Sequence, residues 1–146
     1  MQTIRIAPAD PYNADVAELL FTAIGGDRSR LTAATRHYRT DTATALITAS
    51  IGETLVGVAG YETRADHIVL RHLATAASRR RRGIARRLLA ELRARHPGLA
   101  VIAETADTAL GFYLATGFTA TSLGEKYPGV ERFRLVLADA VGVSTS

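Results

Sequence analysis

Hydrophobic and polar positions along this 146-residue chain follow two alternating patterns, which predict a fold of mixed strands and helices. Short runs rich in β-forming or apolar residues predict seven strands, at 3–6, 43–51, 53–63, 68–75, 99–104, 118–125 and 131–137. Apolar residues spaced three or four positions apart predict four helices, at 12–24, 28–39, 84–96 and 107–117. The run 99–104 is almost wholly apolar, which predicts a strand buried on both faces.

Composition narrows the class of protein. Apolar residues make up 47% of the chain and charged residues 22%, which is typical of a globular protein. No apolar stretch is long enough to span a membrane, and the N-terminus lacks the apolar core of a signal peptide. The chain has no Cys, which excludes disulfides, thiolate metal sites and a cysteine nucleophile. We therefore expect a cytoplasmic protein without a membrane partner.

The positively charged residues are unevenly distributed along the chain. The formal net charge is +4, and the 18 basic residues are all Arg except Lys126. Many of these arginines lie between Arg79 and Arg95. Such a cluster could bind nucleic acid, but no aromatic residue interleaves the arginines to stack on bases. We therefore do not expect nucleic acid as a partner. If the chain were a nucleic-acid binder, its affinity for nucleic acid would fall steeply as the salt concentration rises.

The densest part of this cluster lies between a predicted strand and a predicted helix. It contains the pattern Arg80-x-x-Gly83-x-Ala85. A small-residue turn at a helix N-terminus leaves backbone N–H groups pointing outward at the positive end of the helix dipole. The surrounding arginines favour a polyanion such as a pyrophosphate.

This pattern resembles the [Gln/Arg]-x-x-Gly-x-[Gly/Ala] signature of the GNAT family of N-acetyltransferases, which binds the pyrophosphate of acetyl-coenzyme A (acetyl-CoA). A second segment resembles the family's A-x-x-Φ-Y-x-x-x-G-F motif, where Φ is an apolar residue. The matching positions are Ala109, Phe112, Tyr113, Gly117 and Phe118. Both motifs occur in the family's order, within roughly residues 67–137.

The resemblance implies a fold and an activity. The fold is a single α/β domain, residues 1–146, with a mixed central sheet of about seven strands flanked by about four helices. The activity is acetyl-CoA-dependent transfer of an acetyl group directly to a primary amine of a small molecule or protein, with acetyl-CoA as cosubstrate and no metal. The acceptor is open, and so is the oligomeric state, although homodimers are common in the family.

The resemblance also implies the cofactor contacts. Main-chain groups of Leu73, Ala74 and Thr75 would bind the pantetheine arm, and the stretch from Arg80 to Arg86 the pyrophosphate. The full predicted set is Leu73, Ala74, Thr75, Arg80, Arg81, Arg82, Gly83, Ile84, Ala85, Arg86, Asp107, Ala109 and Tyr113. Ala106 stands where the family commonly has Asn, and Asp107 is the candidate replacement for that contact.

Three residues are candidates for proton transfer. By the resemblance, Tyr113 lies beside the coenzyme thiol and is the candidate general acid, because a phenol is protonated at neutral pH. Val69 stands where some relatives carry a catalytic Glu, so the candidate bases are His72 and Glu104. Each has a structural alternative: His72 as a hydrogen-bonded core histidine, Glu104 as a helix-capping or ion-pairing residue.

Two rival functions stay open within the same fold. One is a transferase that uses another acyl donor, such as propionyl- or succinyl-CoA. The other is a non-catalytic acyl-CoA-binding or regulatory module that retains the phosphate turn but has lost its base.

Overall fold

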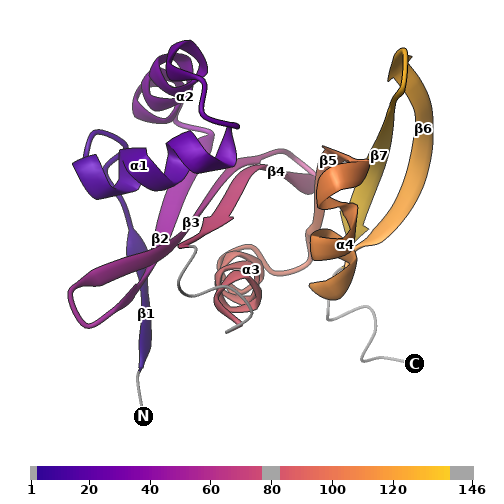
Figure 1. Ribbon diagram of the computed structural model, residues 1–146. Helices are drawn as coiled ribbons and strands as arrows, with labels where there is room; N and C mark the ends of the chain where they lie inside the picture. The colour runs from indigo at the N-terminus through magenta and orange to yellow at the C-terminus, as the bar shows by residue number, and fades with distance from the viewer. Residues whose placement is uncertain (1–2, 77–82, 139–146) are drawn as a thin grey trace. The chain divides into compact units, whose positions relative to one another are not determined.

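The computed structural model describes residues 3–76 and 83–138. Within these residues seven strands and four helices follow one another in the predicted order, so the expected α/β fold is confirmed (Figure 1). They are β1 (Ile4–Pro8), α1 (Ala14–Ala23), α2 (Arg28–Thr40), β2 (Thr44–Ile51), β3 (Thr54–Thr63), β4 (His67–Thr75), α3 (Ile84–Arg95), β5 (Ala100–Ala106), α4 (Asp107–Ala115), β6 (Thr119–Tyr127) and β7 (Val130–Leu137). No helix among the described residues is long and apolar enough to cross a membrane.

The strands are hydrogen-bonded in the order β1-β2-β3-β4-β5-β7-β6. β4 and β5 pair in parallel, whereas β1–β2, β2–β3, β5–β7 and β6–β7 are antiparallel, so the sheet is mixed. The chain divides into two compact units. The first contains Met1–Thr63 and Leu70–Leu92, and the second contains Arg64–Val69 and Arg93–Ser146.

In the first unit, side-chain caps begin both N-terminal helices. Asn13 Oδ1 accepts hydrogen bonds from the backbone N–H groups of Asp15 and Val16, and Asp27 Oδ1 accepts one from Arg30. In Figure 1 both helices lie on one side of β2 and β3. Their buried faces share one apolar cluster with the strands. It consists of Val16, Leu20, Tyr38, Leu46, Val58 and Ala74.

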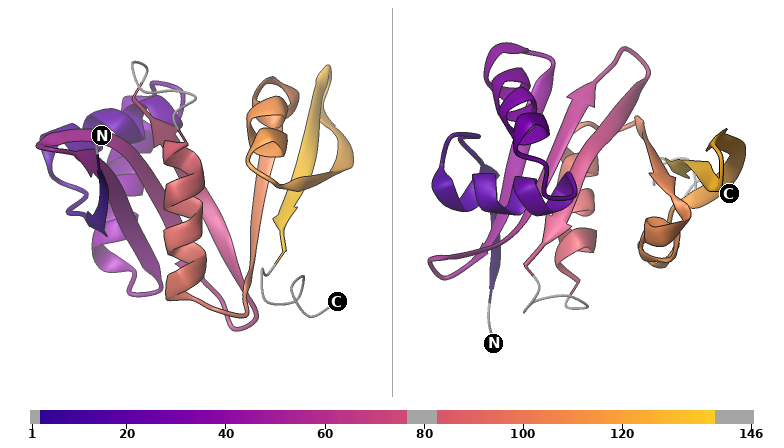
Figure 2. Two further views of the ribbon diagram at one scale, coloured as in Figure 1. Left: turned by 90° about the horizontal axis from the view of Figure 1, so that it is seen from below. Right: turned by 45° about the horizontal axis from the view of Figure 1, so that its top comes forward.

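α3 covers the other face of these strands, as Figure 2 shows. Its buried residues recur with helical spacing: Ile84, Ala85, Leu88, Leu89 and Leu92. Gly57 on β3 permits the close contact, because a Cβ there would lie 2.7 Å from Cγ2 of Ile84 and 3.0 Å from Cδ1 of Leu88. The start of α3 is therefore fixed against the sheet.

In the second unit, α4 packs on β5 and β7. The prediction that the strand near 99–104 is buried on both faces is wrong. Val101 and Ala103 are buried, but the intervening Ile102 is half-buried and Glu104 is exposed. Burial thus alternates along β5, as it does in a strand with one covered face.

Candidate functional site

The turn before α3 is the first part of the predicted cofactor site. Arg80, Arg81 and Arg82 lie outside the described residues, which resume at Gly83. Gly83 is exposed and has a φ of 76°, a conformation that residues with a Cβ rarely adopt. A Cβ at this position would have open space around it, so the backbone angle, and not crowding, favours glycine.

The N-terminus of α3 suits an anion. Ile84 and Ala85 are buried against the sheet, whereas Arg86 is exposed. The first turn of α3 carries no acidic residue, so no carboxylate of this described turn neutralises the positive end of the helix. Predicted phosphate-binding residues 83–86 therefore lie together at a helix N-terminus, with a guanidinium group among them.

The end of β4 carries the predicted pantetheine contacts. The N–H of Arg64 donates to the carbonyl of His67 at the turn between β3 and β4. If every following pair of β3 and β4 residues kept this register, Val56 on β3 would face Thr75 on β4. The carbonyl of Val56 instead accepts a hydrogen bond from the N–H of Ala76, at 2.8 Å. One extra residue therefore lies in β4, which is a β-bulge.

The side chains locate this irregularity. Arg71 and His72 are neighbours, and neighbours on a regular strand point to opposite faces. Here Arg71 reaches Glu62 on β3 and His72 reaches Tyr38 on α2. A bulge between them accounts for both contacts. Leu73, Ala74 and Thr75 directly follow this bulge.

His72, a candidate base, is engaged inside the first unit. Its Nδ1 lies 2.6 Å from the hydroxyl oxygen of Tyr38. Burial, with the nearby charges of Arg71 and His37, lowers the pKa of His72 to about 4. Burial also raises the pKa of Tyr38. Both side chains are thus neutral at pH 7, and this geometry favours the structural alternative for His72.

Glu104, the other candidate base, has a different environment. It is exposed near the C-terminal end of β5, and its cross-strand neighbour on β7 is Arg134. Tyr113 is half-buried on α4. The centroid of its ring lies 5.3 Å from the ring centroid of Phe112 and 5.5 Å from that of Phe118. Burial raises the pKa of Tyr113, so the phenol keeps its proton at neutral pH.

Two further predicted contacts fall at the start of α4. The helix begins at Asp107, and Ala109 is half-buried in its first turn. Asp107 is thus the first residue of α4, and Ala109 follows it two positions later.

A groove of about 520 Å³ lies beside the end of β4, and sequence reasoning missed it. Residues of α1, the start of β3 and the end of β4 line it: Asp15, Glu18, Leu19, Thr22, Glu53, Thr54, Leu55, Thr75 and Ala76. Three of these are acidic, so the groove suits a cation and is unsuited to phosphate. Only the i, i+3 spacing of Asp15 and Glu18 could have pointed to it.

Comparison with known proteins identifies the family. The family model of the acetyltransferase (GNAT) domain matches residues 26–134. No curated protein matches the chain significantly.

Solved structures give the same fold. A GNAT-family acetyltransferase structure from Desulfovibrio desulfuricans superimposes with a TM-score of 0.73 at 19% identity, covering 93% of this chain and 99% of the other. A Bacillus subtilis acetyltransferase in complex with CoA superimposes with a TM-score of 0.70 at 20% identity, covering 93% of this chain and 99% of the other. The Escherichia coli ribosomal-protein-S18-alanine N-acetyltransferase superimposes with a TM-score of 0.71 at 16% identity, covering 94% of both chains.

The matched region runs from just before α2 into β7 and so includes both motifs on which the resemblance rests. This chain belongs to the GNAT family of N-acetyltransferases.

Proposed function

We propose that residues 1–146 act as one domain that transfers the acetyl group of acetyl-CoA directly to a primary amine. The observation that carries this proposal is the N-terminus of α3, where Gly83 has a positive φ and the first helical turn contains no acidic residue. A pyrophosphate fits such a site, because free backbone N–H groups and the helix dipole both favour negative charge. The neighbour from Bacillus subtilis, a fold relative at 20% identity, is in complex with CoA.

Residues on both sides of this turn would hold the cofactor. Backbone N–H groups of Gly83, Ile84 and Ala85 would bind the pyrophosphate, and the exposed guanidinium of Arg86 would add charge. Main-chain groups of residues 73–75 would pair with the amide groups of the pantetheine arm, as an added strand does at a sheet edge. The bulge before Leu73 supports this role, because it interrupts the regular ladder there.

Acetyl-CoA supplies an acetyl group activated as a thioester. Its transfer forms a C–N bond to the amine and breaks the C–S bond, so the amine loses a proton and the thiolate gains one. Tyr113 would protonate the thiolate, since its raised pKa keeps the phenol protonated. Glu104 would take the proton of the amine, directly or through water. We prefer Glu104 to His72 because His72 bonds to Tyr38 and its pKa of about 4 makes it a weak base.

The test is acyl transfer by the purified chain to a panel of amines. Thiol release with acetyl-, propionyl- and succinyl-CoA would be followed by absorbance, and the acylated product identified by mass spectrometry. The proposal predicts release that depends on both an amine and acetyl-CoA, with a mass gain of one acetyl group. A preference for propionyl- or succinyl-CoA would replace acetyl-CoA as the donor. Binding of every donor without turnover of any amine would instead support the non-catalytic module.

A further inference from the structure

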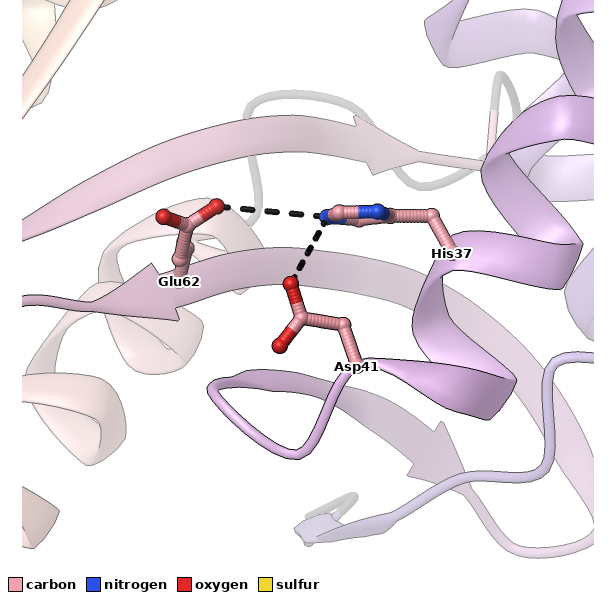
Figure 3. A group of neighbouring side chains, drawn as sticks. All are labelled: His37, Asp41 and Glu62. Carbon is pink, nitrogen blue, oxygen red and sulfur yellow. Dashed lines mark ion pairs between the residues drawn. The ribbon is translucent and has the colours of Figure 1, made fainter.

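Three potential metal ligands converge where the end of α2 meets β3 (Figure 3). Nε2 of His37 lies 3.5 Å from Oδ2 of Asp41 and 3.9 Å from Oε1 of Glu62. All three ligand atoms lie within 4.8 Å of one another. His37 lies in the last turn of α2, Asp41 is the C-cap residue that directly follows this helix, and Glu62 faces them from β3.

His37 supplies a second observation that points to a ligand. Its Nε2 atom is buried and makes no hydrogen bond to any described residue. The distances to the two carboxylates are too long for good hydrogen bonds. Buried polar atoms are nearly always paired, and an orphaned one calls for a partner such as an ion.

We propose that His37, Asp41 and Glu62 form a binding site for a divalent transition-metal cation, with Zn²⁺ as the best fit. One imidazole nitrogen and two carboxylate oxygens are ligands that Zn²⁺ accepts. Bonds of about 2.0–2.2 Å in a tetrahedral site put ligand atoms roughly 3.3–3.6 Å apart. The His37–Asp41 distance already has this value, and small side-chain movements would bring Glu62 to it.

The surrounding charges are compatible with a cation. Arg71 approaches Glu62 with Nη2 at 3.3 Å and Nε at 3.4 Å from Oε1. A carboxylate has about four lone-pair sites, so Glu62 can accept from Arg71 and bind a metal at the same time. The carboxylates of Asp41 and Glu62 attract a cation, and the guanidinium of Arg71 opposes this attraction only in part. Arg71 would act as the outer partner that orients a metal-binding carboxylate.

Exposure gives the cation a route. The Glu62 side chain is only 10% exposed, whereas those of His37 and Asp41 are 39% and 37% exposed. A metal would therefore be held from the buried side by Glu62 and reached from solvent past the other two ligands. A bound ion would tie the end of α2 to β3, and this inference does not depend on the proposed transferase activity.

The test uses the full chain, stripped with EDTA and titrated with ZnCl₂. Calorimetry gives the affinity, and Co²⁺ substitution gives absorption bands that report tetrahedral coordination. At a hundredfold excess over the dissociation constant we expect the melting temperature to rise by about 8 °C. His37→Gln and Asp41→Asn should each weaken binding at least about tenfold, because each removes a ligand while keeping side-chain size.

His67→Gln is the matched control. His67 Nδ1 lies 2.6 Å from Oδ1 of Asp66, but among the described residues this pair is joined by no third ligand. The control should keep wild-type affinity for Zn²⁺. Circular dichroism without metal shows whether each variant is folded. No Zn²⁺ binding by the wild type, or equal binding by folded His37→Gln, would overturn the site; so would an equal loss in His67→Gln, which indicates adventitious binding to histidines.

Discussion

The hydroxyl oxygen of Tyr38 on α2 lies 2.6 Å from Nδ1 of His72 on β4, and the two rings meet edge to face with centroids 5.5 Å apart. This contact joins α2 to β4, the strand that leads into the predicted cofactor site. Both partners are neutral at pH 7, because burial disfavours the charged form of each. Protonation of His72 at low pH, or a larger side chain beside the Tyr38 ring, should therefore break this contact.

Acid should destabilise the protein through His72. The pKa of this imidazole is lowered from 6.5 to about 4 in the folded chain, so the unfolded chain binds the proton more tightly. The stabilisation is fully present above pH 6.5 and is lost as the pH falls toward 4. The loss amounts to at most about 3 kcal/mol. Urea unfolding between pH 8 and 4, in EDTA, measures it.

His72→Gln is the comparison for this titration. It should be less stable than the wild type at pH 8 and should lose less stability on acidification, because the titrating group is gone. Parallel losses in both proteins would show that His72 does not cause the acid sensitivity.

Gly60→Ala should break the same contact by crowding. A Cβ at Gly60 would lie 2.0 Å from the hydroxyl oxygen of Tyr38 and 2.4 Å from Cζ, so the buried ring would have to move. Overpacking and the loss of a buried hydrogen bond together cost roughly 3 kcal/mol in the free energy of unfolding. Urea denaturation gives this value directly.

Gly111→Ala makes the identical change where there is room. Gly111 lies within α4, and a Cβ there would contact nothing within 4 Å. Alanine in a helix is more favourable than glycine by up to about 1 kcal/mol, so this control should be slightly more stable than the wild type. Equal stability of the Gly60 and Gly111 variants would refute the packing described around Tyr38.

Tyr113→Phe tests the general acid. The ring would keep its contacts with Phe112 and Phe118, so the free energy of unfolding should change little. Removing the proton donor should lower kcat about 100-fold while leaving the KM for acetyl-CoA nearly unchanged. Steady-state kinetics with the best amine checks this, and an unaltered kcat would exclude Tyr113 from proton transfer.

Glu104→Gln tests the base. The exposed carboxylate would be replaced by an amide of the same size, so we expect a fall in kcat of about 100-fold. His72→Gln should keep a kcat close to that of the wild type. If kcat instead falls only in the His72 variant, the roles assigned to the two residues are reversed.

The sequence predicted the order of elements because hydrophobic periodicity is a local property. It also placed Gly83 correctly in a turn, since a positive φ at a helix start favours glycine. It could not reveal the bulge in β4, which exists only in the hydrogen-bond register between Val56 and Ala76.

Long-range contacts explain the other omissions. Glu62 joins His37 and Asp41 only after β3 has folded against α2, so spacing alone could not predict a metal cluster. The apolar run of β5 suggested burial on both faces because composition does not report what covers each face.

Calorimetric titration of wild type, Gly83→Glu and Gly98→Glu with acetyl-CoA tests whether the N-terminus of α3 binds the cofactor. Both glycines have a positive φ, 76° and 87°, and open space where a Cβ would lie, so the two variants carry the same strain and charge. Only the first puts a carboxylate at the N-terminus of α3. We predict binding by the wild type and by Gly98→Glu, and at least about 100-fold weaker binding by Gly83→Glu, a difference of roughly 2.7 kcal/mol. No binding by folded wild type, or equal binding by all three proteins, would show that the N-terminus of α3 is not an acetyl-CoA site.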